Sequence, residues 1–225
     1  MNAGMSVNDV CLVGKLASEF RFSHRSRGIG YYVADFSSER ISGVRDQIPV
    51  RVSEGQRELL SHNPGRYVRI RGHFQSFNYS EQGRRKLLLS IFAKMLDFPD
   101  GPETAENSIY LEGYVCRETI SRHTWTGIRI TDILLAVNRP YKGTDYLPCI
   151  SWGKYAQLAA SFSVGAHIWI RGRIQSRDYE KDIGGVMEKR RAYEVSASEV
   201  GEYISIKKRT RRSSFRSQAS QVSAT

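Results

Sequence analysis

The sequence predicts an all-β fold with short helices, made of two tandem five-stranded barrels and followed by a disordered basic tail. The first observation is an internal repeat: the segment from Val68 to Tyr79 returns about one hundred residues later, from Ile168 to Tyr179. The second is that both halves consist of short, alternating apolar and polar runs typical of strands. The repeat period of about one hundred residues makes each half of the chain long enough to bury a core of its own.

Five strands are predicted in each half, in the same order. In the first half they cover residues 10–16, 31–36, 47–52, 67–77 and 86–96. In the second half they cover residues 109–116, 128–137, 146–152, 167–177 and 191–200. These runs are rich in β-branched, aromatic and alternating apolar residues, so each offers one face to a barrel interior.

One short helix is predicted between the third and fourth strands of each half. Tyr155, Leu158 and Phe162 lie at helical spacing within residues 154–163, ahead of a glycine that can end the helix. The counterpart, residues 56–62, ends at the turn sequence Asn63-Pro64-Gly65. Five strands with one helix after the third form the layout of the OB-fold, a Greek-key barrel.

These elements divide the chain into four parts. Residues 1–97 form a first OB-fold domain, residues 98–106 a linker rich in turn formers, and residues 107–204 a second OB-fold domain. Residues 205–225 are rich in Ser, Arg and Lys, so we expect a disordered tail.

Composition excludes several classes of protein. Three scattered cysteines without a CxxC pair, and five histidines that never fall at metal-ligand spacing, indicate a reduced protein without a metal or other cofactor. The chain has neither a signal-like start nor an apolar run of membrane-spanning length, so we expect a cytoplasmic protein without membrane contact. The acidic residues are scattered among basic ones, so we expect no enzymatic activity.

The formal net charge of +11 favours a polyanionic partner, because Lys and Arg gain affinity by displacing counterions from phosphates. The end of the chain is its most basic part, since residues 207–225 hold six Lys or Arg and no acidic residue. Two interpretations of this tail stay open: it grips DNA or an acidic protein, or it is a passive extension.

The aromatic residues of the second half lie in polar surroundings, which is unusual for core residues. Tyr141 is in a polar turn, Tyr146 stands two residues before a proline, and Tyr179 is in a charged hairpin. Exposed rings beside Lys or Arg offer stacking faces for bases while the cations hold the phosphates. The alternatives are loop packing for Tyr141 and Tyr179, a core position for Trp152, and domain-interface packing for Trp169.

Three blocks of the second half carry a family resemblance. They read TDILLAVNRPY at 131–141, DYLPCISWGK at 145–154 and IRGRIQSRDY at 170–179. In order and spacing they resemble the bacterial single-stranded DNA-binding protein family, over residues 107–200. The resemblance implies that four aromatic residues stack on bases of a wrapped strand: Tyr141, Tyr146, Trp152 and Tyr179. The remaining candidate contacts are Tyr79, Trp169, Arg71, Arg139, Lys142, Lys154, Arg171, Arg173 and Arg177.

The first half resembles the family only loosely, over residues 8–97. Of the four stacking positions only Tyr79 is kept, with Phe77 beside it, and the other three hold Ser42, Gln47 and Ser53. Two interpretations compete. The first half grips the DNA backbone through its arginines, or it is a degenerate copy kept for pairing and stability. The arginines in question are Arg45, Arg51, Arg69, Arg71, Arg84 and Arg85.

The sequence therefore predicts sequence-independent binding and protection of single-stranded DNA in replication, recombination or mobile-element DNA transfer. The location is expected to be the bacterial cytoplasm, with the nucleoid, a plasmid or a phage. RNA stays open as a ligand because stacking and backbone grip serve both nucleic acids. The alternative is a primosome-like OB-fold adaptor that acts mainly through protein contacts.

The resemblance also implies an assembly and partners. Single-domain members of the family work as four barrels, so a chain with two barrels is expected to form a homodimer. Replication or recombination proteins are candidate partners. The basic tail is, however, the electrostatic opposite of the acidic tail through which family members recruit such proteins.

Overall fold

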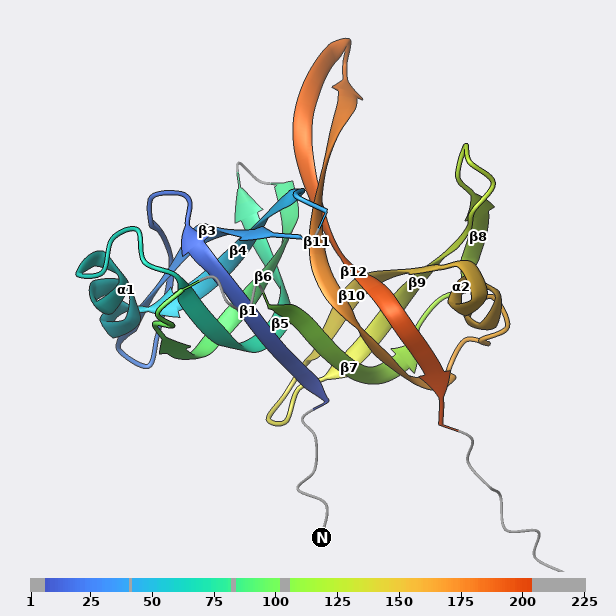
Figure 1. Ribbon diagram of the computed structural model, residues 1–225, viewed down its shortest axis with the longest axis horizontal. Coiled ribbons are helices and arrows are strands. Elements are labelled where there is room, and N and C mark those ends of the chain that lie inside the picture. The colour runs from blue at the N-terminus through green and yellow to red at the C-terminus, as the bar shows by residue number, and fades with distance from the viewer. Residues whose placement is uncertain (1–6, 41, 82–83, 102–105, 204–225) are drawn as a thin grey trace, which may run out of the picture.

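The computed structural model describes residues 7–40, 42–81, 84–101 and 106–203, without the side chains of residues 78–81, 84–86, 183 and 186. Its strands form two barrels that lie side by side (Figure 1). We call them the N barrel, Asn8–Asp97, and the C barrel, Asn107–Glu202. The predicted class, two tandem OB-fold barrels with short helices, is confirmed. The tail predicted at residues 205–225 lies outside the described residues, as does part of the predicted linker, residues 102–105.

Both barrels have the same order of elements. The N barrel contains β1 (Asn8–Leu16), β2 (Arg21–Ser26), β3 (Ile29–Glu39), β4 (Arg45–Ser53), α1 (Glu54–Ser61), β5 (Val68–Glu81) and β6 (Arg84–Asp97). The C barrel contains β7 (Asn107–Val115), β8 (Ile120–His123), β9 (Arg129–Asn138), β10 (Thr144–Trp152), α2 (Gly153–Ala159), β11 (His167–Ile183) and β12 (Val186–Glu202). Within the described part of the chain, neither helix is long and apolar enough to cross a membrane.

The prediction of five strands per half is wrong, because each barrel has a sixth strand that was not expected, β2 in the N barrel and β8 in the C barrel. All residues of β8 are exposed and β2 has no buried residue, so neither strand has the apolar alternation that reveals a strand in sequence. The helix predicted at residues 154–163 is also shorter in the structure. It ends at Ala159, and the N–H of Phe162 bonds back to the carbonyl of Ala159 in a turn.

The strands form one continuous sheet in the order β2-β3-β4-β6-β5-β1-β7-β11-β12-β10-β9-β8. The order is mirrored about the antiparallel pair of β1 and β7, in which Val10 lies opposite Ile109. Further pairings of β1 with β3 and of β7 with β9 close the two barrels. The barrels are therefore related by an approximate twofold axis that passes through the β1–β7 pair.

The glycine of the Arg-Gly repeat has the same structural role in both barrels. The ladder register shifts just before Gly72 on β5 and just before Gly172 on β11. A Cβ atom would stand 2.0 Å from the carbonyl oxygen of Phe92 at the first position, and 2.2 Å from that of Ser196 at the second. Only glycine allows the backbones to approach this closely at the bulge.

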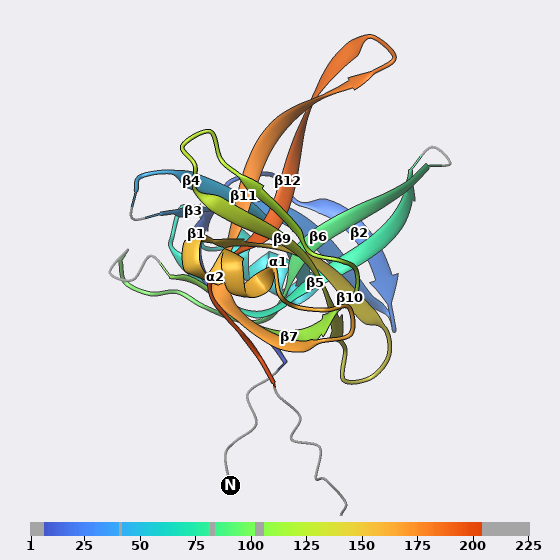
Figure 2. The ribbon, with the colours of Figure 1, turned by 90° about the vertical axis from the view of Figure 1, so that its right-hand side faces the viewer.

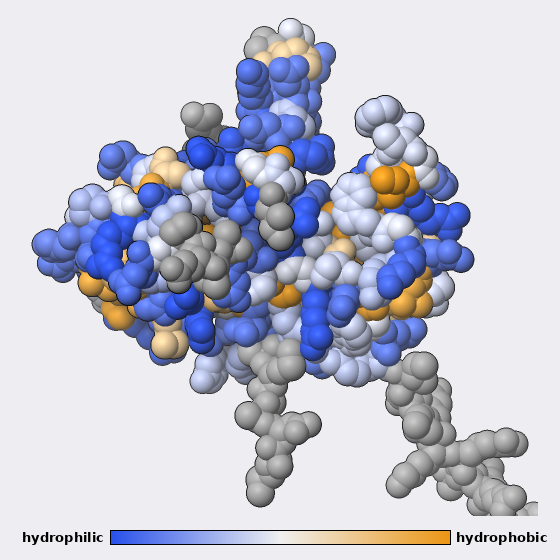
Figure 3. Space-filling view, in the orientation of Figure 1, coloured by the Kyte–Doolittle hydropathy of each residue, from blue (hydrophilic) through white to orange (hydrophobic). Residues whose placement is uncertain are grey.

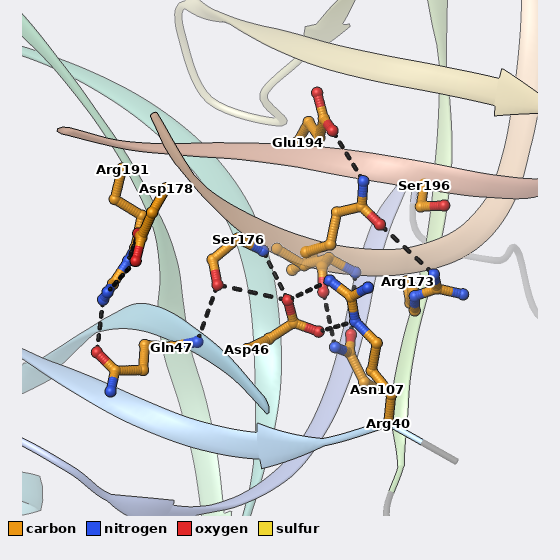
Figure 4. Close-up of polar contacts among 12 residues, drawn as sticks. Arg40, Asp46, Gln47, Asn107, Arg173, Ser176, Asp178, Arg191, Glu194 and Ser196 are labelled. Carbon is orange, nitrogen blue, oxygen red and sulfur yellow. Dashed lines mark hydrogen bonds and ion pairs between the residues drawn. The ribbon is translucent and has the colours of Figure 1, made fainter. Parts of the chain in front are cut away.

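A buried aspartate of each barrel binds the other barrel. Asp46 of β4 is fully buried and accepts a hydrogen bond from Arg40 Nε at 2.7 Å. The same carboxylate accepts the backbone N–H of Ser176, on β11 of the C barrel, at 2.8 Å (Figure 4). The Ser176 hydroxyl oxygen in turn accepts the N–H of Gln47 at 3.0 Å.

The equivalent contact, related by the approximate twofold axis, joins Asp145 of β10 to the N barrel. Asp145, 1% exposed, accepts Arg139 Nε at 2.9 Å and the backbone N–H of Ser76 at 2.7 Å. The hydroxyl oxygen of Ser76 accepts the N–H of Tyr146 at 3.1 Å. The serine of the Gln-Ser step in the sequence repeat thus serves to pair the barrels.

Candidate nucleic-acid interface

Exposed rings follow strand β10 of the C barrel. Tyr141, in the turn before β10, is fully exposed, and Tyr146 and Trp152 on the strand itself are 50% and 38% exposed. Even-numbered residues of β10 share one face because side chains alternate along a strand, whereas Leu147 and Cys149 point into the core. We call Tyr141, Tyr146 and Trp152 the aromatic ridge. Its two strand residues are separated by about 20 Å at the usual rise per residue.

The Trp152 side chain is held in place by one hydrogen bond. Its Nε1 donates to the hydroxyl oxygen of Ser196, on β12, at 3.2 Å. Trp152 also occupies the N-cap position of α2, where its side chain forms no capping hydrogen bond with the helix backbone, whereas Ser53 at the equivalent position of the N barrel forms a capping box with Gln56. A cap is typically worth about 1 kcal/mol. The C barrel therefore has an exposed indole where a stabilising cap would fit.

Tyr179 lies on a long hairpin that rises from the C barrel. The distal parts of β11 and β12 form this hairpin, which we call the arm, and it projects well beyond the barrel (Figures 1 and 2). The guanidinium carbon of Arg177 lies 5.8 Å from the centroid of the Tyr179 ring. Arg191 anchors the base of the arm, because it pairs with Asp178 and also donates to Gln47 of the N barrel.

Three predicted cations accompany these rings. Lys142 is exposed directly after Tyr141, and Arg177 is exposed on the arm. Lys154 follows Trp152 by two residues, and its Nζ atom lies 4.8 Å from the centroid of the Tyr155 ring. Rings and cations therefore alternate from the β9–β10 turn to the start of α2 and on the arm.

Two predicted cations lie instead at the contact between the barrels. Arg139 is bound to Asp145 and to the Ser76 carbonyl oxygen, at 2.8 Å. Hydrogen bonding to Asp145 raises the pKa of Arg139. Arg173 lies beside the Arg40–Asp46 pair, and its pKa is lowered by burial and by the charge of Arg40 (Figure 4). Both guanidinium groups stand among barrel-contact residues rather than along the aromatic ridge.

Three more predicted residues lie on the outer face of the central strands. Arg71 and Arg171 line a shallow groove over the β1–β7 pair, together with Asp9 and Tyr110. Trp169 lies flat against Gly201, since a Cβ there would stand 2.6 Å from the indole. Arg171 lies 5.7 Å from the Trp169 ring.

The first-half arginines that the structure describes are mostly engaged. Arg45 pairs with Glu39 at 3.2 Å, Arg69 pairs with Asp97 at 3.1 Å, and Arg51 is buried. The predicted contact Tyr79 lies on β5 opposite Lys86, but its side chain and those of residues 84 and 85 are outside the described residues.

One exposed residue was missed by the sequence analysis. Trp125 is 97% exposed at the tip of the β8–β9 hairpin, and Ile120 and Ile128 near it are 54% and 48% exposed. Figure 3 shows hydrophobic surface beside this hairpin, which projects to the same side of the C barrel as the arm (Figure 1). The available signal was a tryptophan between two threonines in a turn that ends at Gly127, whose φ is +81°.

Metal-ligating and nucleophilic side chains are dispersed in the described part of the chain. Among the described residues no three His, Cys, Asp or Glu side chains gather as a metal site. Burial and the neighbouring Glu106 raise the pKa of Cys11 to about 11, and burial also raises the pKa values of Cys116 and Cys149. These thiols are protonated at neutral pH and so are poor nucleophiles.

Two OB barrels that share a sheet edge, one of them with exposed rings along a strand, define a tandem OB-fold protein. The model of the single-strand binding protein family matches residues 106–203. Single-stranded DNA-binding protein B of Bacillus subtilis is 33% identical over 85 residues, which cover 35% of this chain and 75% of that protein. The chain therefore belongs to the single-strand binding protein family, which confirms the resemblance found in the three sequence blocks.

Other relatives agree. The single-stranded DNA-binding protein of Clostridium tetani is 36% identical over 101 residues, 42% of this chain and 68% of that protein. Single-stranded DNA-binding protein 3 of Listeria innocua is 33% identical over 85 residues, 35% of this chain and 53% of that protein. The chain spans about half the length of the first curated relatives it matches.

Solved structures extend the likeness to both barrels. The wild-type single-stranded DNA binding protein from Thermus aquaticus matches with a TM-score of 0.69 and 20% identity, over 96% of each chain. A deletion mutant of the same protein matches with a TM-score of 0.67 and 21% identity, over 88% of this chain and 95% of that one. The tandem arrangement is thus a shared fold.

Proposed function

We propose that this protein binds single-stranded DNA, largely independently of sequence, through the aromatic ridge and the arm of the C barrel. The observation that carries the proposal is the exposure of Tyr141, in the turn before β10, and of Tyr146 and Trp152 on β10, which is 100%, 50% and 38%. The barrel core does not use these rings. A stacked base gains roughly 1–3 kcal/mol on such a ring, and any base has a face that can stack.

The cations beside the rings fit the same ligand. Lys142, Lys154 and Arg177 can hold phosphates, which carry no sequence information. Such binding protects DNA or keeps it unpaired during replication, recombination or mobile-element transfer, and it requires no catalytic step. Relatives of this chain are bacterial proteins named for binding single-stranded DNA, which favours a role in the bacterial cytoplasm.

We further propose that two chains assemble into a four-barrel homodimer. The outer face of the C barrel supports this. His167 is stacked between Tyr114 and Tyr203, with ring centroids 4.7 and 4.6 Å away, and Tyr114 is 44% exposed. Closed twofold pairing would cover this face. Light scattering should give a two-chain mass with and without a long oligonucleotide. A monomer in both conditions would contradict the proposal.

The decisive experiment is a salt-dependent titration of the full chain with oligo-dT, oligo-U and a DNA duplex. We expect tight binding to oligo-dT, weak binding to duplex, and affinity that falls with salt. Single replacements Tyr141→Ala, Tyr146→Ala and Tyr179→Ala should each cost about 1–3 kcal/mol of binding free energy. Because these side chains lie outside the core, thermal stability should change little.

Three outcomes would redirect the proposal. If all three tyrosine variants bind like the unmodified protein, the ridge is not the binding surface. Weak affinity for every nucleic acid, together with a stable complex with a replication protein, would favour the adaptor alternative. Equal affinity for oligo-U would extend the ligand class to RNA.

A further inference from the structure

Four rings of the N barrel gather outside its core. The His24 ring, from β2, is stacked between Tyr31 of β3 and Phe77 of β5, with centroid distances of 5.0 and 5.5 Å and interplanar angles of 12° and 17°. Phe92 of β6 lies 5.7 Å from Tyr31. All four side chains are half-buried. We call His24, Tyr31, Phe77 and Phe92 the ring cluster.

A buried cation lies behind these rings. Arg51 is 4% exposed, and its guanidinium carbon lies 5.2 Å from the Phe77 centroid and 5.7 Å from that of Phe92. It donates to Ser90 Oγ at 3.3 Å, its Nε has no hydrogen-bond partner, and no carboxylate among the described residues pairs with it. A buried charge without a directly paired counter-ion is costly. The carboxylate of Asp145 acts on Arg51 only at longer range and is itself paired with Arg139, so this arrangement leaves positive potential for an outside anion.

The barrel fold does not require this cluster, as the C barrel shows. Strand register matches three of these positions in the N barrel to aliphatic or small residues in the C barrel. The matched pairs are Tyr31 with Ile130, Arg51 with Ile150, and Phe92 with Ser196. Ile130 and Ile150 are 2% and 4% exposed and close that end of the C barrel by ordinary packing.

Two neighbouring positions, one at the end of the third long strand and one on the last strand, hold one large and one small residue in each barrel, but the order is reversed between the barrels. In the C barrel the large residue is Trp152, on β10, and its indole reaches Ser196 on β12. In the N barrel the matching residues are Ser53 and Phe92. The N barrel therefore keeps a ring on this face, supplied by a neighbouring strand.

The hairpin that carries His24 is strongly basic. Residues 20–34 contain three arginines and no acidic residue, and Arg21, Arg25 and Arg27 are all exposed. Rings beside arginines form the combination that holds the bases and phosphates of an unpaired strand.

We propose that the N barrel is a second binding surface for single-stranded DNA, on which bases stack against the ring cluster while Arg51 and the β2–β3 arginines attract the phosphates. This inference rests on the proposed function of the C barrel. It resolves the choice between a backbone-gripping domain and a degenerate copy: the N barrel has its stacking surface on other strands.

The test compares full-length variants with oligo-dT. The triple variant Tyr141→Ala/Tyr146→Ala/Trp152→Ala disables the ridge, and Tyr31→Ile/Phe77→Leu, added to it, disables the ring cluster with residues of similar apolarity. The ridge variant should keep measurable affinity, and the cluster substitutions should lower it by a further factor of roughly ten or more. The matched control is Phe22→Ala, a 61% exposed ring on the other face of β2, which should change affinity less than about twofold.

A second measurement requires no substitution and so does not depend on the folding of variants. Bromodeoxyuridine-substituted oligo-dT, photo-crosslinked to the unmodified protein, should label peptides within residues 20–35 or 70–95. Equal affinity of the ridge variant with and without the cluster substitutions, and no crosslink in those peptides, would overturn the inference while leaving C-barrel binding intact. An unmodified protein that does not bind oligo-dT would overturn the proposed function itself and this inference with it.

Discussion

Removal of the Asp46 carboxylate should destabilise the paired barrels strongly. In Asp46→Ala, the N–H of Ser176 loses its acceptor and Arg40 loses a carboxylate 2.6 Å away. Breaking a buried ion pair costs about 3–5 kcal/mol. Because the Arg40 side chain is 22% exposed, water can reach it in the variant, so we expect the lower end, about 3 kcal/mol. For a protein of this size that corresponds to a melting temperature lower by roughly 6–12 °C.

Calorimetry and urea unfolding at pH 7 would measure the effect. Asp46→Asn is the matched variant, because it keeps an acceptor for Ser176 but not the charge for Arg40. Its melting temperature should fall between those of Asp46→Ala and the unmodified protein. Glu39→Ala, which breaks the exposed Arg45 pair, should leave stability nearly unchanged because its side chain is 55% exposed. A melting temperature of Asp46→Ala within about 2 °C of the unmodified protein would refute the assigned role of this contact.

Three further predictions concern binding and pH. Trp152 fluorescence should be quenched by oligo-dT, so Trp152→Phe should remove most of the signal change and Trp169→Phe should not; the reverse would place DNA on the outer face. Truncation after Ile206 should flatten the salt dependence of binding if the six basic residues of 207–225 displace counterions, and an unchanged slope would assign the tail another role. Burial, with Arg51 or Lys94 nearby, lowers the pKa values of His24 and His73, so the unfolded chain takes up protons first as pH falls. Stability should therefore be greatest above pH 6.5 and decline below it, and His24→Gln should reduce the decline measured by urea midpoints between pH 8 and 5.5; a midpoint independent of pH would contradict this.

The sequence was sufficient for the elements with a buried face. Ile168 and Ile170 alternate with outward residues, and that alternation located the repeated strands and the two barrels. It could not locate β2 and β8, whose stability comes from edge pairing with β3 and β9 rather than from burial. The two strands of the arm were also predicted too short, because the charged residues that pair beyond the barrel lack the apolar alternation of a strand with a buried face.

The exposure of the candidate site residues was predicted best where the local sequence determines it. The polar turn around Tyr141 predicted a ring that is fully exposed. The positions of Arg139 and Arg173 depend on Asp145 and Asp46 and on the pairing of the two barrels, which no local pattern contains. The ring cluster was missed for the same reason, because His24, Tyr31, Phe77 and Phe92 come from four separate strands.

The β1–β7 junction places the two barrels in one polypeptide, and their surfaces differ. If the two barrels were identical, exchanging them would leave the contacts available to a bound strand unchanged. Here one end of the path presents Tyr141, Tyr146 and Trp152, while the other presents a different set of side chains. The two barrel surfaces of each chain therefore differ chemically. A polynucleotide, which itself runs 5′ to 3′, would have one preferred direction across each chain.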